Sequence, residues 1–218
     1  MSKVLVAVPH RVTTPQFFID KTKEHFAGFT YPNKELVLMP NELPADGRKY
    51  GCNADARNML IDKHLRPKHD YVLWLDVDLV SVPRDLIEQL LSVSTEGIVA
   101  PFVFVEKTSP HAMPDFNSGG WFYDVGGFKR NGMFADAWPP YFSQMNGNVM
   151  EMESVGCCYI VPAYLYHPYG LRYAPKGNEV EHLSFCDAAR AIGVQIFANP
   201  ALKVEHAFLP KYGEAWHG

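Results

Sequence analysis

The sequence predicts a single α/β domain, with a mostly parallel central sheet flanked by helices and a smaller antiparallel part in the second half. In the first 105 residues, short apolar runs alternate with amphipathic helical patterns, which is typical of parallel strands joined by helices. From residue 106 to 148 this alternation gives way to Gly, Pro, Asn and aromatic residues. The 218 residues are 47% hydrophobic, enough for one substantial core. We therefore expect one domain over residues 1–218, with halves 1–105 and 106–218.

Four apolar runs in the first half are expected to be strands. They cover residues 3–9, 35–39, 71–78 and 98–105. Helices are expected between them over residues 15–26 and 53–64 and from Pro83 onward, because apolar positions recur there at helical spacing. In the first of these helices, Phe17, Phe18 and Thr22 are expected to face the core. The order of these elements is Rossmann-like.

The second half is expected to begin with loops and to end with regular elements. Residues 106–148 show no long helical period, and aromatic residues on such loops are suited to binding sugar rings. A strand is expected over residues 150–161 and a helix over 184–192, ended by Gly193. Two last strands are expected over residues 194–197 and 201–206.

Charge and composition argue against several classes of protein. The net charge is −4 and the Lys and Arg residues are scattered, so we expect no nucleic-acid partner. The longest apolar runs are too short to span a bilayer and no signal peptide is evident, so we expect a soluble, cytoplasmic protein with no transmembrane segment. A disulfide between the adjacent Cys157 and Cys158 would be strained, and reduced cysteines are expected. The sequence leaves open that this is the first domain of a longer polypeptide.

An Asp-x-Asp motif closes the most apolar of the expected strands. Asp76 and Asp78 follow the run from Tyr71 and, on an extended chain, share one direction while Val77 packs away from them. Carboxylates at the carboxyl end of a central strand are well placed to bind a ligand, and hard oxygen ligands suit Mg²⁺ or Mn²⁺. The alternative is an acidic strand end that only faces solvent. The motif alone leaves both interpretations open.

The order of motifs along the chain resembles that of the GT-A glycosyltransferases, which use nucleotide sugars and carry a DxD motif on one Rossmann-like domain. The segments that carry the resemblance are residues 4–9, 53–58, 76–78, 155–161, 181–186 and 204–206. Within that fold, the chain is most similar to the yeast mannan-polymerase type and to glycosyltransferases encoded by large DNA viruses. The resemblance implies transfer of a hexose or deoxyhexose from a nucleoside-diphosphate sugar to a glycan or glycoprotein acceptor. The absence of a guanine-specific signature and the compact size favour UDP-sugars over GDP-sugars.

The resemblance also implies where the nucleotide binds. Pro9, His10 and Arg11 follow the first strand, where the family places the base and ribose. Arg57, at the start of its helix, is expected to reach the nucleotide because guanidinium recognises phosphate in a bidentate manner. The alternatives are a basic surface turn for His10 and Arg11 and a local ion pair for Arg57.

The same resemblance assigns a metal centre to the DxD motif. The segment Asp76-Val77-Asp78 contacts the donor: Asp76 contacts its ribose or sugar, and Asp78 binds the metal that bridges the two phosphates. His206 matches the family's late histidine, which completes the metal site. Imidazole suits Mn²⁺ better than Mg²⁺, so Mn²⁺ is the expected ion. The alternative for His206 is a structural histidine.

The catalytic base depends on the stereochemistry, which the sequence leaves open. An inverting enzyme needs a base in the segment that contains Glu181 and His182. Many inverting relatives have Glu-Asp there, so either residue of Glu181-His182, or neither, is the base. A retaining enzyme would use a carboxylate such as Glu151 or Glu153, whose alternative is the exposed face of a strand. Donor and acceptor are expected to be recognised by the middle loops, through Asp115, Asn117, Trp121, Tyr123 and Asp124.

Two other functions compete with this interpretation. The segment from Asp76 to Val80 fits the nucleophile motif of haloacid-dehalogenase-type phosphatases, with Asp76 as the nucleophile, but no late acidic pair follows it. A non-catalytic carbohydrate-binding domain is the other alternative, although binding a sugar alone needs no metal triad. A sugar-nucleotide pyrophosphorylase would need a Gly-rich loop after the first strand, which the chain lacks.

Overall fold

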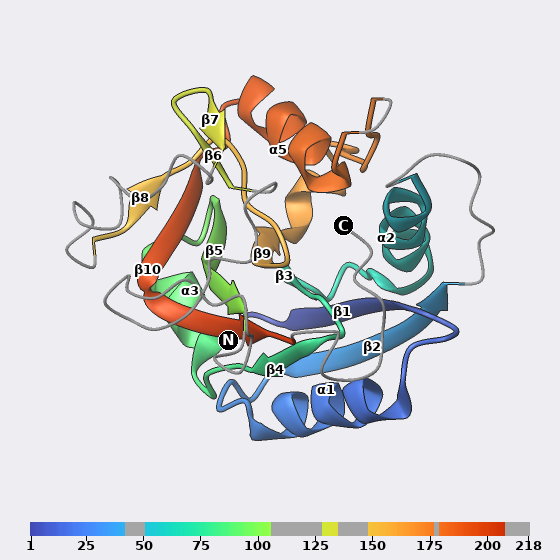
Figure 1. Cartoon of the computed structure of the whole chain (residues 1–218). Helices are drawn as coiled ribbons and strands as arrows, with labels where there is room; N and C mark the ends of the chain where they lie inside the picture. The colour runs from blue at the N-terminus through green and yellow to red at the C-terminus, as the bar shows by residue number, and fades with distance from the viewer. Residues whose placement is uncertain (42–50, 106–127, 135–147, 177–178, 208–218) are drawn as a thin grey trace.

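The computed structural model describes residues 1–41, 51–105, 128–134, 148–176 and 179–207 (Figure 1). Within them, one sheet of eight strands has the order β2-β1-β3-β9-β5-β10-β4, with β8 paired to β10. These strands are β1 (Val4–Arg11), β2 (Lys34–Asn41), β3 (Tyr71–Leu75), β4 (Leu79–Ser81), β5 (Ile98–Val105), β8 (Met150–Glu151), β9 (Cys158–Pro162) and β10 (Ile196–His206). The helices are α1 (Gln16–Gly28), α2 (Gly51–His64), α3 (Leu86–Val93), α5 (Glu181–Ala191) and the 3₁₀ turn η2 (Ala163–Leu165). A separate hairpin joins β6 (Lys129–Arg130) to β7 (Met133–Phe134).

The sheet is mostly parallel, as the sequence predicts. Strands β2, β1 and β3 run parallel to one another, and β5 runs parallel to β10. Strand β9 lies antiparallel between β3 and β5, and β4 and β8 are antiparallel to β10. Strands from both halves of the sequence therefore share one sheet, and the carboxyl ends of β1, β3, β5 and β10 meet at the same edge.

Side chains on the two faces of the sheet build two hydrophobic cores. Along β1, Leu5 and Ala7 point into one core, while Val4, Val6 and Val8 point into the other, as alternation on an extended strand requires. Helices α2 and α5 cover the first face, and α1 and α3 cover the second (Figure 1). Burial on both faces explains why these strands are almost continuously apolar in sequence.

The DxD segment is a turn, and the expectation of one strand over residues 71–78 is wrong at its end. Strand β3 stops at Leu75. The Asp76 N–H still donates to Cys157 O at 3.1 Å, in register with the pairing of β3 and β9, but the chain then turns: the Leu79 N–H lies 3.5 Å from Asp76 O, and the Ala207 N–H donates to Asp78 O at 2.8 Å. The short strand β4, which the sequence pattern does not predict, follows at Leu79. Asp76 and Asp78 are therefore oriented by this turn and not by strand alternation.

Other element boundaries also differ from the expectation. The expected strand over 150–161 is split into β8 and β9, and the two expected strands near the end are one strand, β10, with an irregularity between Asn199 and Lys203. Helix α3 begins at Leu86, three residues after Pro83. Phe17 is 50% exposed, whereas Phe18 and Thr22 are buried as expected. The predicted sugar-binding residues of the middle loops lie outside the described residues: Asp115, Asn117, Trp121, Tyr123 and Asp124.

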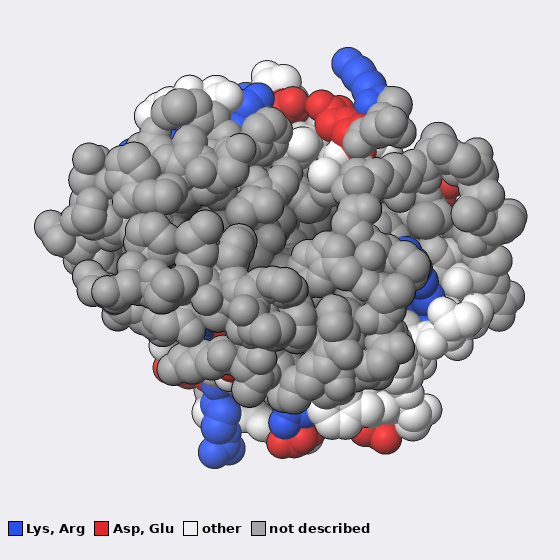
Figure 2. Space-filling view, in the orientation of Figure 1, with Lys and Arg blue, Asp and Glu red and all other residues white. Residues whose placement is uncertain are grey.

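Figure 2 shows one face of the molecule with its charged side chains coloured. On the face in Figure 2, the acidic and basic side chains of the described residues are interspersed along the edges of the view. No helix in the described ranges combines the length and the apolar character needed to cross a membrane.

Candidate active site

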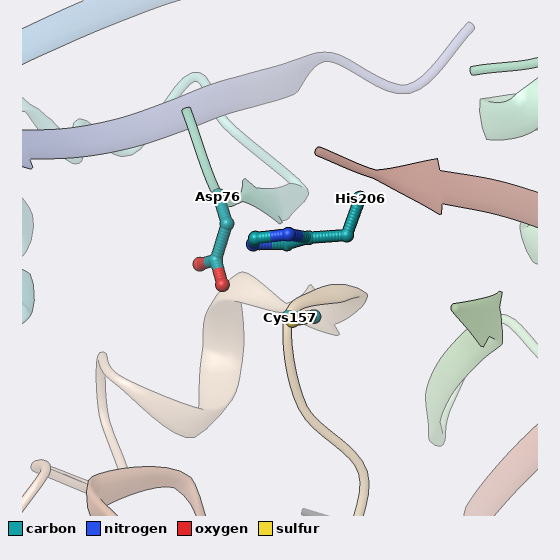
Figure 3. Close-up of side chains that lie close together, drawn as sticks. All are labelled: Asp76, Cys157 and His206. Atoms are coloured by element: carbon teal, nitrogen blue, oxygen red, sulfur yellow. The ribbon is translucent and has the colours of Figure 1, made fainter. Parts of the chain in front are cut away.

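Four chemically active side chains meet at the carboxyl edge of the sheet. Asp76 follows β3, Asp78 precedes β4, Cys157 precedes β9, and His206 ends β10. A carboxylate oxygen of Asp76, the sulfur of Cys157 and a ring nitrogen of His206 all lie within 4.8 Å of one another. Figure 3 shows these three side chains approaching one another from separate segments. The fold thus brings together residues that are up to 130 positions apart in sequence.

Asp78 and His206 form a close buried pair. The His206 Nε2 lies 2.9 Å from Asp78 Oδ1, and the His206 Nδ1 donates to Ala207 O at 2.9 Å. Burial opposes both charges, but the ion pair outweighs it, so the pKa of Asp78 is lowered and that of His206 is raised. A backbone carbonyl that accepts from one ring nitrogen orients the other nitrogen, which is how metal-binding histidines are commonly held.

Helix α1 fixes the backbone of the DxD turn. The Thr22 hydroxyl donates to Val77 O at 3.2 Å, and the His25 Nε2 donates to Leu79 O at 3.2 Å. Val77 is partly buried and packs on the core beneath, and its predicted contact with the donor stays a prediction. Because these bonds come from a regular helix, the two carboxylates are oriented before any ligand binds. The sequence analysis placed Thr22 on the buried face but missed this role.

Arg57 joins the DxD turn to helix α5. Its Nη2 donates to Asp76 Oδ1 at 3.2 Å, and its Nε donates to Glu181 Oε1 at 3.2 Å. The Arg57 and Glu181 side chains are only 5% and 4% exposed, whereas that of Asp76 is 29% exposed. Burial raises the pKa of Asp76 in spite of the opposing charge of Arg57. The guanidinium therefore holds the partly exposed carboxylate of Asp76 and the buried carboxylate of Glu181.

Aromatic rings surround the Arg57 guanidinium. Its central carbon lies 4.9 Å from the ring centre of Trp74, 5.8 Å from that of Tyr159 and 5.7 Å from that of Tyr173. A buried network fixes these rings: Trp74 Nε1 donates to the Tyr166 hydroxyl at 2.8 Å, and the Tyr173 hydroxyl lies 2.9 Å from that of Tyr159. Cation–π contacts in a desolvated setting stabilise the guanidinium by about 2 kcal/mol. Arg57 is thus a rigid anchor and not a mobile surface side chain.

Several polar atoms beside Arg57 are buried and have no hydrogen-bond partner among the described residues. They are Arg57 Nη1, Glu181 Oε2 and both ring nitrogens of His182. Each such atom costs about 1–3 kcal/mol when it has no partner, so a group of them marks a place where a polar ligand or water completes the bonding. Burial lowers the pKa of His182 to about 4, so this imidazole is neutral at pH 7.

His182 is expected to make the fold sensitive to acid. Its folded-state pKa of about 4 lies below the unfolded value of 6.5, so the unfolded chain binds the extra proton first as the pH falls. The free energy of unfolding should therefore decrease by about 3 kcal/mol from this residue as the pH falls from 6.5 to 4. Urea unfolding across this range should show a smaller loss for His182→Gln, while the surface variant His167→Gln should keep the wild-type dependence. Equal pH dependence in wild type and His182→Gln would contradict this assignment.

The nucleotide residues predicted after the first strand lie near the DxD turn. Strand β1 ends at Arg11, where His10 Nδ1 donates to Arg11 O at 2.9 Å. The charge of Arg11 contributes to the lowered pKa of Asp78, so the guanidinium is close enough to act on that carboxylate. Pro9 pairs with Met39 on β2 at the same edge. These positions are compatible with the predicted nucleotide contacts, which stay a prediction.

Glu151 and Glu153 make their described contacts elsewhere. Glu151 pairs with Phe197 near the start of β10, at the end of that strand opposite to His206. Glu153 accepts a hydrogen bond from the Gly132 N–H at 3.0 Å and lies 3.7 Å from Lys129 Nζ, both on the β6–β7 hairpin. The described contacts thus bring Glu181 and His182, but not these two glutamates, into the cluster around Arg57.

The donor set at the DxD turn fits a divalent cation. Two carboxylates and an imidazole whose other nitrogen is held by a carbonyl are ligands that Mn²⁺ accepts. The sulfur of Cys157 beside them was not among the predicted ligands. The sequence indicated only that Cys157 lies within the strand expected over residues 150–161.

Comparisons with known proteins are consistent with this geometry. The family model described as Anp1 matches residues 44–138. The mannan polymerase II complex anp1 subunit of Schizosaccharomyces pombe is 22% identical over 193 residues, which cover 76% of this chain and 43% of that protein. The mannan polymerase II complex ANP1 subunit of Saccharomyces cerevisiae is 23% identical over 200 residues, which cover 79% of this chain and 39% of that protein. The chain thus spans about two fifths of the length of these curated relatives.

Solved structures show the same fold. S. aureus TarS 1-349 in complex with UDP superposes with a TM-score of 0.59 at 10% identity, covering 94% of this chain and 60% of that one. The same protein in complex with UDP-GlcNAc gives a TM-score of 0.55 at 10% identity, covering 94% and 58%. The chain therefore has the GT-A fold, and its predicted similarity to the yeast mannan-polymerase type is confirmed. The predicted similarity to viral glycosyltransferases stays a prediction.

Proposed function

We propose that this protein is a metal-dependent glycosyltransferase that moves a hexose or deoxyhexose from a nucleoside-diphosphate sugar to a glycan acceptor. The observation that carries the proposal is the convergence of two pairs, Asp78 with His206 and Asp76 with Arg57, at the carboxyl edge of a GT-A sheet. Ligands of open α/β sheets bind at this edge. Fold alone does not fix function, so the chemistry of these side chains is the stronger support.

We place the diphosphate of the donor beside the Asp78–His206 pair. A divalent cation held by Asp78 and His206 would supply a Lewis acid for the phosphates of the leaving nucleotide. Arg11 adds positive charge at the same edge, where a nucleoside diphosphate needs it on departure. Asp76, whose Oδ1 is held by Arg57, lies beside His206 and would contact the metal or a hydroxyl group of the donor. The first half of the chain would thus bind the nucleotide, and the second half would contribute to the sugar and acceptor sites.

The identity of the donor is the second part of the proposal. Uridine nucleotides are our first choice, and TarS, which has the same fold, has been solved with UDP and UDP-GlcNAc. The two yeast relatives are subunits of mannan polymerase complexes, so mannose nucleotides belong in the same test. A panel of UDP-sugars and GDP-sugars, assayed with Mn²⁺ for slow donor hydrolysis, should reveal one preferred donor. Absence of metal-dependent turnover with every donor would contradict the proposal.

We propose Glu181 as the base that takes the proton of the acceptor hydroxyl in an inverting reaction. Its Oε1 is held by Arg57, while its buried Oε2 has no partner among the described residues and would be the oxygen that takes the proton. The neutral His182 beside it is suited to a hydrogen bond with the acceptor. Glu153, the alternative of a retaining enzyme, makes its described contacts with the hairpin.

Glu181→Gln is expected to lower kcat by about 10²- to 10⁴-fold, because the amide keeps the shape and the contact with Arg57 but cannot accept the proton. Affinity for the donor should change little, since the DxD turn is untouched. Steady-state kinetics with Glu179→Gln as the matched control would check this. A kcat within a few-fold of wild type would show that Glu181 is not the base.

The phosphatase alternative makes a different prediction. It requires Asp76 to attack a phosphorus atom, but one of its oxygens is bound to Arg57 at 3.2 Å. Release of inorganic phosphate from a phosphomonoester, lost in Asp76→Asn, would support that alternative. Binding of a glycan without donor turnover would instead support the carbohydrate-binding domain.

A further inference from the structure

The sulfur of Cys157 lies inside the proposed metal centre. It is within 4.8 Å of a carboxylate oxygen of Asp76 and of a ring nitrogen of His206 (Figure 3). The Asp78 carboxylate is 2.9 Å from the His206 ring. Two ligands of one cation are commonly about 3–4.5 Å apart, given metal–ligand distances of about 2.0–2.3 Å. The spacing of Asp76, Cys157 and His206 is therefore close to that of ligands of one ion, and Asp78 adjoins this group through His206.

The backbone of Cys157 is held in an uncommon conformation that places this side chain. Its φ is +58°, a region that L-residues other than Asn and Asp seldom adopt. The Cys158 N–H donates to Gly156 O at 2.6 Å, which makes Cys157 the central residue of a three-residue turn. The Cys157 carbonyl accepts from the Asp76 N–H at 3.1 Å, so the turn is tied directly to the DxD segment.

Such strain is retained mainly where the surroundings or a function require it. Glycine would adopt this φ without a steric penalty, and the residue just before it is Gly156. A cysteine at this position keeps a sulfur beside the Asp76 carboxylate and the His206 imidazole, at the expense of local stability. Metal coordination is a chemistry that uses a thiolate, carboxylates and an imidazole together.

We propose that Cys157 is a metal ligand, and that the centre formed by Asp76, Asp78, Cys157 and His206 prefers thiophilic divalent cations such as Zn²⁺ and Co²⁺ over Mg²⁺. This inference rests on the metal centre of the proposed function and deepens it. A thiol binds a cation after losing its proton, and the resulting thiolate favours Zn²⁺ strongly over hard cations. Zn²⁺ should thus compete with Mn²⁺ for the same ligands.

Titration of the full chain with Co²⁺ tests the proposal without any activity measurement. A cobalt–thiolate bond gives an intense ligand-to-metal charge-transfer absorption in the ultraviolet, which oxygen and nitrogen ligands do not give. We expect this absorption in wild type and its loss in Cys157→Gly. The matched control is Cys158→Ala, because Cys158 is the adjacent buried cysteine and should leave the absorption unchanged. Competition with a zinc chelator should show that Cys157→Gly lowers the affinity for Zn²⁺ by at least about tenfold. The affinity for Mn²⁺ should fall much less.

Cys157→Gly is also the variant least expected to disturb the fold, because glycine relieves the positive φ. The thermal midpoint of Cys157→Gly should equal or exceed that of wild type. Cys157→Ala, which keeps a β-carbon but lacks the sulfur, should also lose the charge-transfer absorption.

Two outcomes would overturn the proposal while the proposed function stands. The first is that Co²⁺ binds without the charge-transfer absorption. The second is that the absorption persists in Cys157→Gly. In both cases, metal-dependent binding of UDP or GDP would still be seen. Conversely, a cobalt–thiolate centre in a protein that binds no nucleotide with any metal would support the ligand role of Cys157 and contradict the glycosyltransferase. Absence of any Co²⁺ or Zn²⁺ binding would contradict the metal centre itself.

Discussion

Asp78→Ala is expected to lower the metal-dependent rate of donor turnover by about 10³-fold, because a metal ion supplies several kcal/mol of stabilisation to the departing diphosphate. The variant removes a carboxylate that lies 2.9 Å from His206. The fold should survive, since the turn is held by the Asp78 carbonyl and by helix α1, and neither contact uses the Asp78 side chain. Circular dichroism and thermal unfolding would confirm this, and donor hydrolysis with Mn²⁺ would measure the loss.

His206→Ala is expected to show the same loss of turnover, because it removes the other ligand of the pair. The matched control is Asp187→Ala, which deletes an exposed carboxylate on helix α5. If Asp78→Ala and His206→Ala both retain wild-type turnover and the same dependence on Mn²⁺, the metal centre is placed wrongly. Loss of turnover in Asp78→Ala alone would leave His206 as a structural residue.

Arg57→Ala is expected to have the largest effect on stability, about 3–5 kcal/mol of the free energy of unfolding. The substitution leaves the Glu181 carboxylate, whose side chain is 4% exposed, without its ion-pair partner. It also empties a space that is lined by three aromatic rings. Urea unfolding would measure the loss, and turnover should fall together with stability because Asp76 and Glu181 lose their orientation.

Two further variants separate the charge of Arg57 from its geometry. Arg57→Lys keeps the charge, but a single ammonium cannot reproduce the separate bonds from Nε and Nη2, so we expect a substantial loss of both stability and turnover. The double variant Arg57→Met with Glu181→Met should recover much of the stability, since apolar replacement of a buried ion pair is often tolerated, but not the turnover. If Arg57→Ala unfolds within about 1 kcal/mol of wild type, the guanidinium is not the anchor described here.

Periodicity and composition were enough to predict the sheet and its helices. The run that starts at Val4 and the run from Ile98 are apolar at nearly every position because both faces of the sheet are covered. Boundaries were less predictable where tertiary hydrogen bonds decide them. The strand after Tyr71 ends at Leu75 because the chain turns after Asp76, and the Asp78 carbonyl bonds to Ala207, a residue that sequence periodicity cannot place nearby.

Long-range pairings within the site could not be derived from the sequence. The resemblance singled out Arg57 and Glu181 separately, but their ion pair joins positions 124 residues apart. Nor did the pattern of aromatic residues indicate that Trp74, Tyr159 and Tyr173 surround one guanidinium. Such contacts depend on which faces of the sheet and helices meet, and this is decided by the packing of the whole domain.

Cys157 illustrates the same limit at a single residue. The sequence shows two adjacent cysteines after a glycine, which argued only against a disulfide between them. Its position beside Asp76 depends on the pairing of β9 with β3, and its orientation depends on the positive φ. Neither feature has a signature in the order of residues.

Calorimetric titration of UDP and GDP into the full chain, with and without Mn²⁺, tests the central claim most directly. If Asp78 and His206 hold a metal that binds the diphosphate, at least one nucleotide should bind wild type only when the metal is present, and binding should be lost in Asp78→Ala. Binding of equal strength after metal removal by a chelator, or equal binding to Asp78→Ala, would contradict the account.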